Sequence, residues 1–338
     1  MIGRTIRVLE QDPRLAVSIF HPSSGGSPLR GIDVYAPCQS EASAVLREMG
    51  VELDNLNITD ELTIGNTATT TSEALPVILL SPGFGVERDM YLGIISKLVP
   101  KGYNVVTISA PGESVFTVYP DGGFVKQGEE MAKLDSADYN VWYSILEDRS
   151  RAITAVNEYL EILNRSDLEL RGLFDLGNVA AVGHSLGGAA VLEATKLNNR
   201  IKAAILLDPS FHLLRWDGAT SSVPALLLRQ EASTYDAMAA VMDEQIALDY
   251  IEGQRRAFAS LTNGCFYRIN GAQHMSFSDV PLHYNDYHAV SIHTATVDMT
   301  TAFLEEAFQS GHVPPERTIK LSTVVPINSE GDPIELRE

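Results

Sequence analysis

From Pro76 onward, short apolar runs of strand length alternate with longer amphipathic segments of helix length. Strands of a parallel sheet are almost continuously apolar, because helices cover both of their faces. The alternation therefore predicts an α/β fold with a mostly parallel central sheet and helices on both sides. The expected strands are Val77–Leu80, Asn104–Ser109, Val179–Val182, Ile201–Leu207, Val223–Leu228 and Cys265–Ile269, and the expected helices lie near 89–99, 147–164, 186–197, 235–262 and 296–309.

The ends of the chain differ from this central pattern. Thr5–Leu9 and Leu15–Phe20 have the length and composition of two further strands joined by a turn. Residues 311–338 carry four prolines and are expected to form a C-terminal tail of uncertain order. We therefore expect residues 1–310 to form one α/β domain.

One Gly-x-Ser-x-Gly pattern is present, at Gly183–Gly187, where the chain reads Gly-His-Ser-Leu-Gly. The predicted strand Val179–Val182 precedes it and a helix start follows it. A serine at such a strand-to-helix turn is held in a tight elbow above the sheet. Glycines on either side leave space for the neighbouring backbone. Ser185 is therefore the predicted nucleophile.

A serine hydroxyl needs a base that works near neutral pH, and histidine is the suitable side chain. In the fold in which the nucleophilic serine occupies such a strand-to-helix elbow, the histidine comes last in the chain, in a loop after a late strand. His274 lies in the loop that leaves the predicted strand Cys265–Ile269. The histidine in the turn, His184, adjoins the nucleophile and must point away from it. His274 is therefore the predicted general base.

An acid that orients this histidine can come from the end of either of two neighbouring strands. Asp208 follows the predicted strand Ile201–Leu207. Glu231 follows the next predicted strand, and Asp236 lies a little further along. Spacing alone does not choose among these three carboxylates.

Several of these segments resemble one known family, the plasma-type platelet-activating factor acetylhydrolases and their microbial relatives. The resemblance rests on the turn Gly183–Gly187, on Leu206–Pro209 (Leu-Leu-Asp-Pro) and on Gly271–Asp279 (Gly-Ala-Gln-His-Met-Ser-Phe-Ser-Asp). Leu80–Gly85 is similar to the family's segment after the third strand, and Ile19–Pro22 to an early strand that ends in an aromatic–proline signature. The similarity extends over about residues 5–310.

This resemblance implies an α/β-hydrolase fold and ester hydrolysis. It favours Asp208 as the acid, with Glu231 next. It also implies an oxyanion hole formed by the backbone N–H groups of Phe84 and Leu186, in agreement with the donors expected for this fold. The chain differs from many relatives at Pro82, where they have histidine; a backbone donor does not depend on that side chain.

Residues 111–145 form a long connection that contains many aromatic residues. Connections of this length are usually functional, for example as lids, whereas the plainer alternative is a surface loop with aromatic side chains packed on the core. Because the segment begins at the carboxyl end of a predicted strand, we expect it to form a wall of the substrate pocket. The candidate lining residues are Phe116, Tyr119, Tyr139, Trp142 and Tyr143, and of these Tyr119, Trp142 and Tyr143 are the predicted substrate-binding residues.

Composition restricts the classes of molecule that the protein is expected to bind. The formal net charge of −19 makes nucleic-acid binding unfavourable. No run of eighteen apolar residues is present to span a membrane. The two cysteines, Cys38 and Cys265, form no Cys-x-x-Cys pair, and no metal or cofactor is expected. No signal peptide is recognisable, so we expect a cytoplasmic protein, or a secreted one if a leader has been removed.

The predicted function is that of a serine carboxylic ester hydrolase acting through an acyl-enzyme on a small or short-acyl, partly apolar ester. Two alternatives stay open at this point. An acyltransferase or thioesterase would use the same three residues, and a non-catalytic binding protein could share the fold. The oligomeric state is not predicted.

Overall fold

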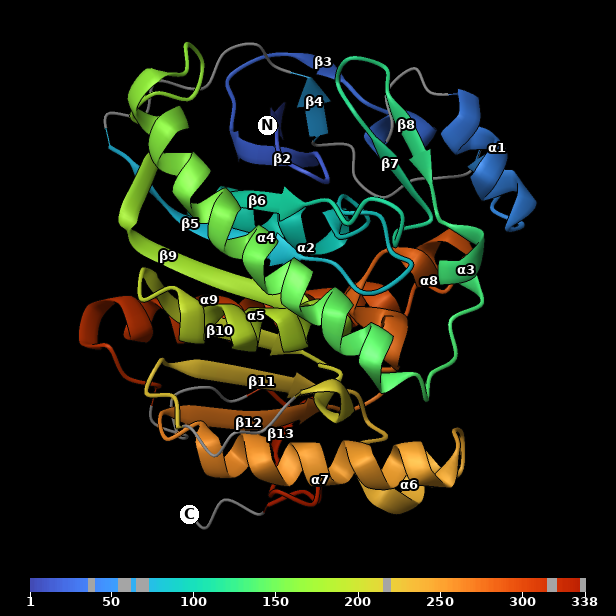
Figure 1. The fold of residues 1–338 in the computed structure, drawn as a ribbon. Helices are drawn as coiled ribbons and strands as arrows, with labels where there is room; N and C mark the ends of the chain where they lie inside the picture. The colour runs from blue at the N-terminus through green and yellow to red at the C-terminus, as the bar shows by residue number, and fades with distance from the viewer. Residues whose placement is uncertain (36–39, 54–61, 65–72, 215–219, 315–320, 335–338) are drawn as a thin grey trace.

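The computed structural model describes residues 1–35, 40–53, 62–64, 73–214, 220–314 and 321–334. Within these residues, eleven strands form one sheet in the order β13–β12–β11–β10–β9–β5–β6–β2–β1–β4–β3 (Figure 1). Its six central strands, from β12 to β6, all pair in parallel. They are β5 (Leu75–Ser81), β6 (Asn104–Ile108), β9 (Phe174–His184), β10 (Ile201–Leu207), β11 (Ala225–Arg229) and β12 (Gly264–Ile269).

Further strands extend the sheet at both edges. β2 pairs antiparallel with β6 and with β1, and β1 pairs in parallel with β4. At the opposite edge β13 pairs antiparallel with β12. A separate hairpin joins β7 and β8. The bounds are β1 (Ile2–Leu9), β2 (Leu15–Pro22), β3 (Ser27–Pro28), β4 (Leu62–Ile64), β7 (Phe116–Val118), β8 (Phe124–Lys126) and β13 (Val324–Pro326).

Helices cover both faces of the sheet, and Figure 1 shows α4 and α5 in front of it and α2 and α9 behind. The helices are α1 (Ser40–Glu48), α2 (Leu92–Leu98), α3 (Glu129–Ala132), α4 (Tyr139–Ser166), α5 (Leu186–Leu197), α6 (Tyr235–Ala239), α7 (Glu244–Ser260), α8 (Val280–His283) and α9 (Ala289–Ser310). Short 3-10 helices are η1 (Gly31–Val34), η3 (Val99–Lys101), η4 (Phe211–Leu213) and η5 (His274–Phe277). None of the described helices combines the length and the apolar character that crossing a bilayer requires.

The two layers of helices explain the continuous apolar runs of the central strands. In β5, Ile78 and Leu80 pack in the core that includes α2 and α9. Val77 and Leu79, which alternate with them, pack in the core that includes α4, α5 and α7. Successive side chains of a strand point to opposite faces, so a strand covered on both sides needs apolar residues at every position.

Several elements differ from the sequence prediction. The helix expected near 147 begins at Tyr139, where Asp138 accepts a hydrogen bond from the Val141 N–H as the N-cap. The helix expected over 235–262 is two helices, because Asp243 caps a new start and accepts from the amides of Gln245 and Ile246. The segment 111–145 is therefore divided among a hairpin, a short helix and the first residues of α4.

The C-terminal segment, predicted as a tail of uncertain order, contributes a strand. Its described part, 321–334, contains β13, which pairs with β12 at Tyr267, Arg268 and Ile269. Further along, Gly331 accepts a hydrogen bond from the Ser233 hydroxyl at 2.8 Å. This segment therefore joins the sheet and packs on the loop that follows β11.

Candidate active site

Ser185 lies in the tight turn between β9 and α5, with φ of 56° and ψ of −122°. A non-glycine residue in this region is strained and is retained where the surrounding structure holds it. The Ser185 N–H donates to the Leu207 carbonyl at 2.9 Å, which ties the turn to β10. A Cβ atom on Gly183 would lie 2.6 Å from the Gly188 nitrogen, and one on Gly187 would lie 2.5 Å from the Pro82 carbonyl oxygen. The two glycines therefore allow both the turn and its close approach to the loop after β5.

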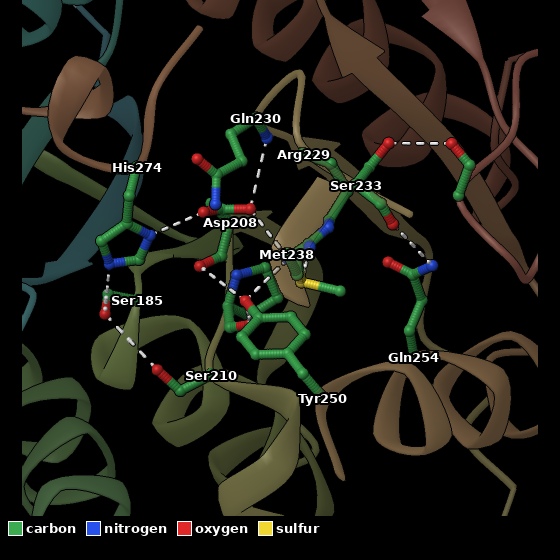
Figure 2. A network of polar contacts seen from close by, with 12 residues as sticks. Ser185, Asp208, Ser210, Arg229, Gln230, Ser233, Met238, Tyr250, Gln254 and His274 are labelled. Carbon is green, nitrogen blue, oxygen red and sulfur yellow. Dashed lines mark hydrogen bonds and ion pairs between the residues drawn. The ribbon is translucent and has the colours of Figure 1, made fainter. Parts of the chain in front are cut away.

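The structure brings the predicted serine, histidine and aspartate together at the carboxyl edge of the sheet (Figure 2). His274 Nε2 lies 2.9 Å from Ser185 Oγ, and His274 Nδ1 lies 2.6 Å from Asp208 Oδ2. Asp208 is fully buried, whereas the His274 side chain is 38% exposed. The arrangement thus runs from a buried carboxylate to an accessible hydroxyl.

The hydrogen-bond partners determine where the protons lie. A carboxylate can only accept hydrogen bonds, so His274 Nδ1 carries a proton and donates to Asp208 Oδ2. Nε2 then has a lone pair, and the Ser185 hydroxyl donates to it. This is the tautomer that can take a proton from the serine.

Asp208 is held ionised by its neighbours. Burial alone would raise the pKa of this carboxyl, but Arg229, His274 and the Gln230 amide outweigh it, and the pKa falls to about 2. Arg229 Nη1 lies 2.8 Å from Asp208 Oδ1, and the Gln230 N–H donates to the same oxygen at 3.2 Å. The other oxygen, Oδ2, is left for His274.

The two competing carboxylates lie elsewhere. Glu231 Oε2 accepts from the Gly271 N–H at 2.9 Å, and the Glu231 N–H donates to Ala272. Glu231 therefore braces the loop that carries His274 without contacting the imidazole. Asp236 lies in the first turn of α6.

The two amides predicted as an oxyanion hole lie on either side of the close approach just described. Phe84 follows Gly83 in the loop after β5, and Leu186 is the first residue of α5. Within the described part of the chain, neither amide donates a hydrogen bond to another group. Neither N–H group is therefore occupied by another described residue.

The loop that carries Phe84 is fixed by groups outside it. Arg149 of α4 donates to the Pro82 carbonyl and pairs with Glu113 at 2.8 Å. The Gly83 N–H donates to the Tyr91 hydroxyl at 2.8 Å. The loop's conformation thus depends on side chains that contact its backbone.

Tyr91 also connects this loop to His184. The Tyr91 hydroxyl donates to His184 Nδ1 at 3.0 Å, and His184 Nε2 donates to the His274 carbonyl at 2.9 Å. Burial, together with the neighbouring His274, lowers the pKa of His184 to about 3, so its ring stays neutral. His184 therefore holds the loop after β5 and the backbone of His274 in place, and its ring nitrogens are not available as a base.

Of the predicted substrate-binding aromatics, Trp142 contacts the loop that follows β5. Its ring contacts that of Phe84 edge-on, with 4.9 Å between centroids. Tyr143 stacks on Tyr139 at 6.1 Å. Tyr119 donates from its hydroxyl to the Arg14 carbonyl at 2.9 Å, with the Arg14 guanidinium over its ring, and makes no hydrogen bond to Ser185, His274 or Asp208.

Two further expectations concern metals and cysteines. Among the described residues, no group of three or more His, Cys, Asp or Glu side chains is arranged to hold a metal ion. Cys265 is buried in β12, with its Sγ 3.6 Å from the Ala225 carbonyl oxygen. Cys38 lies outside the described residues.

Sequence reasoning missed Arg229, Tyr91 and Arg149. Arg229 ends the apolar run Ala-Leu-Leu-Leu-Arg of β11, and a charged residue there is expected to be solvated, whereas its side chain is fully buried. Tyr91, the residue before α2, and Arg149 of α4 reach the site from segments that carry no motif. Only Arg229 had a weak sequence signal. It ends an interior strand, and the carboxyl ends of such strands face the binding site in open α/β sheets.

Comparisons with known proteins agree with this architecture. A model described as the alpha/beta hydrolase family matches residues 77–322. The platelet-activating factor acetylhydrolase of Cavia porcellus is 27% identical over 165 residues, which cover 43% of this chain and 37% of that enzyme. The bis(hydroxyethyl) terephthalate hydrolase of Streptomyces coelicolor is 25% identical over 214 residues, 63% of this chain and 55% of that enzyme. The chain thus spans about a third to a half of the length of these two relatives.

A solved structure shares the fold over almost the whole chain. The ferulic acid esterase from Streptomyces cinnamoneus superposes with a TM-score of 0.71 over 97% of this chain and 96% of its own, at 21% sequence identity. The predicted fold class and the resemblance drawn from the short motifs are confirmed. Because the family model matches most of the sequence, the chain belongs to the alpha/beta hydrolase family.

Proposed function

We propose that this protein is a serine carboxylic ester hydrolase in which Ser185 is the nucleophile, His274 the general base and Asp208 the acid that orients the histidine. The observation that carries the proposal is the continuous pair of hydrogen bonds, 2.9 Å from Ser185 to His274 and 2.6 Å from His274 to Asp208. The relatives' names describe an acetylhydrolase, a terephthalate hydrolase and a ferulic acid esterase, and support the same class of reaction.

The first half of the reaction makes an acyl-enzyme. Ser185 Oγ attacks the ester carbonyl carbon while its proton moves to His274 Nε2. The negative charge that develops on the carbonyl oxygen is stabilised by the N–H groups of Phe84 and Leu186. When the tetrahedral intermediate collapses, the alcohol leaves with the proton held by His274.

The second half returns the enzyme to its resting state. A water molecule gives a proton to His274 and attacks the acyl carbon, and the bond to Ser185 Oγ breaks. Ser185 takes the proton back as the carboxylic acid departs. Asp208 stays ionised throughout and stabilises the imidazolium of each step, which agrees with its lowered pKa.

The proposed substrate is a neutral, partly apolar ester with a small or short acyl group. Trp142 packs against Phe84, whose amide is one of the proposed oxyanion donors, and this contact supports a position of its ring beside the bound ester. Tyr143 and Tyr139, at the start of the same helix, are the further candidates for this wall. The net charge of −19 disfavours anionic esters.

Replacement of the nucleophile tests the proposal. Ser185→Ala is expected to lower kcat for a chromogenic short-chain ester by about 10⁴–10⁶-fold. The matched control is Ser210→Ala, which removes a hydroxyl 3.4 Å from that of Ser185 and is expected to stay within about tenfold of the parent. A fluorophosphonate should label the parent at Ser185 and leave Ser185→Ala unlabelled. Residual activity of Ser185→Ala within tenfold of the parent would exclude Ser185 as the nucleophile.

A second measurement separates hydrolysis from acyl transfer. The ester is turned over with and without an added alcohol, and the acid and the new ester are quantified. A hydrolase forms mostly acid, whereas new ester in excess of acid would identify an acyltransferase.

A further inference from the structure

We propose that Arg229, anchored by Tyr250, is a positioning residue for Asp208 and makes the functional unit four residues long: Arg229, Asp208, His274 and Ser185. This inference rests on the proposed function and adds to it a group that never touches the substrate.

The two oxygens of the Asp208 carboxylate have different partners (Figure 2). Oδ2 accepts from His274 at 2.6 Å, and Oδ1 lies 2.8 Å from Arg229 Nη1. Both Arg229 and Asp208 are fully buried. A fixed donor on Oδ1 prevents rotation of the carboxyl group and so directs Oδ2 at the imidazole.

Tyr250 fixes Arg229 in turn. Arg229 Nη1 donates to the Tyr250 hydroxyl at 2.6 Å, and the guanidinium lies over the Tyr250 ring, 4.5 Å from its centroid. The Tyr250 hydroxyl donates to the carbonyl of Pro209, the residue after Asp208. The arginine is therefore held between the ring and the carboxylate, which is the geometry of a cation–π contact next to an ion pair.

A merely structural ion pair would not need this position. Asp208 has a φ of 41°, a conformation that is costly for aspartate and that places its carboxyl group in the site. With Arg229 absent, a fully buried carboxylate would have only a neutral histidine and one amide as partners. It would then gain a proton more readily, and a protonated Asp208 no longer serves to stabilise an imidazolium.

The titratable groups around the pair come from five elements. Arg229 of β11 and Tyr250 of α7 face Asp208 from one side, and His274 and His184 from the other. His212 of η4 stacks on Tyr250, with 5.2 Å between ring centroids. Burial lowers the pKa of His212 to about 4 and that of His184 to about 3, so neither carries charge at neutral pH. Among the residues named here, Arg229 therefore supplies the positive charge beside Asp208 at neutral pH.

The test compares Arg229→Lys with Arg229→Gln, two side chains that can both donate to Asp208 but differ in charge. The readout is the pH dependence of kcat/KM, whose acid limb reports protonation of the Asp208–His274 pair as a unit. Arg229→Gln removes a cation next to the pair, so its acid limb is expected to move to higher pH by about one unit or more, with kcat at neutral pH lower by at least about tenfold. Arg229→Lys is expected to keep the acid limb within about 0.3 unit of the parent.

Tyr250→Phe provides a test that leaves the ion pair intact. It is expected to lower kcat about 2–10-fold without changing KM or the acid limb, because the charge of Arg229 remains. Melting temperatures of all variants identify losses that come from unfolding. An acid limb of Arg229→Gln that coincides with those of Arg229→Lys and the parent would overturn the proposal, as would an unchanged kcat in Tyr250→Phe.

The result of the Arg229 test can be distinguished from the result of the Ser185 test of the proposed function. If Ser185→Ala is inactive and the parent is labelled at Ser185, the ester hydrolase assignment stands whatever Arg229 does. If Ser185→Ala stays active, the assignment itself fails, and the pH dependence of the Arg229 variants then has no bearing on it.

Discussion

Asp208→Asn is expected to abolish activity because its side-chain amide must orient with the NH₂ group toward His274. Arg229 and the Gln230 amide both donate toward the position of Asp208 Oδ1. An asparagine therefore places its carbonyl oxygen there, because its NH₂ group would meet two donors. The NH₂ group then faces His274 and donates to Nδ1, which forces the imidazole proton onto Nε2.

The wrong tautomer cannot accept a proton from Ser185. Loss of this function in a serine–histidine–aspartate site costs about 10⁴-fold in kcat, and we expect a loss of that order. The substitution also leaves Arg229 buried with no counter-charge. Removing one partner of a buried ion pair costs about 3–5 kcal/mol, so the free energy of unfolding should fall as well.

The assay measures kcat for a chromogenic ester together with urea unfolding. The control is Glu231→Gln, because a glutamine oxygen can still accept from the Gly271 amide; it should retain activity within about tenfold. If Glu231→Gln loses activity by about 10⁴-fold and Asp208→Asn does not, the assignment of the acid is wrong. If Asp208→Asn is inactive yet as stable as the parent, the argument from the buried charge of Arg229 is wrong.

Three further predictions concern the loop, the aromatic wall and the histidines. Gly187→Ala places a Cβ 2.5 Å from the Pro82 carbonyl oxygen and should move the loop that carries Phe84, lowering kcat by about 10²-fold or more, while Gly177→Ala in β9 serves as the stability control. Trp142→Ala should change kcat/KM for esters in a way that depends on chain length. Tyr119→Ala, which loses a hydrogen bond to the Arg14 carbonyl, should mainly lower the melting temperature. Equal effects of Trp142→Ala at every chain length would show that Trp142 does not line the pocket. Burial lowers the pKa of His283 to about 4. Between about pH 6.5 and 4 the unfolded chain therefore binds a proton at this residue that the folded chain does not. The free energy of unfolding falls as the pH drops through that window. Between pH 7 and 5 the free energy of unfolding of His283→Gln should therefore fall by about 2 kcal/mol less than that of the parent. A parallel fall of His283→Gln and the parent would contradict the lowered pKa.

The central fold and two of the three proposed catalytic residues could be predicted because strong local patterns carry them. Continuous apolar runs are required by strands covered on both faces, so β5, β6, β9, β10, β11 and β12 each overlap an expected strand. Ser185 and His274 occupy a strand-to-helix turn and a loop after the last parallel strand, where chain order alone restricts the choices.

The acid could not be settled from residue spacing, because β10 and β11 end at the same edge of the sheet and each is followed by a carboxylate. What distinguishes them in the structure is the positive φ of Asp208 and the turn of Glu231 toward Gly271, and neither leaves a pattern in the sequence. Arg229 was missed for a related reason. A cation at the end of an apolar run normally reaches solvent, and only the distant Tyr250 and Asp208 make burial of this one favourable.

The start of α4 and the strand β13 were missed because their sequence signals are weak. Residues 139–146 mix aromatic, aliphatic and uncharged polar side chains without a clean period, so the helix start depends on the cap at Asp138. β13 is three residues long, ends in Pro326 and follows a proline-rich stretch. Its pairing depends on the edge that β12 offers, which only the folded sheet provides.

Strand β13 also covers the hydrogen-bonding edge of β12, which could otherwise pair with a strand from another chain. Without it, β12 would expose unpaired N–H and C=O groups along the end of a strongly apolar parallel sheet, and such edges recruit strands from other chains. β13 replaces this edge with a short strand that contains Pro326, which has no N–H to donate outward. A chain shortened to residue 310 is therefore expected to self-associate through β12, although it would keep Ser185, Asp208 and His274.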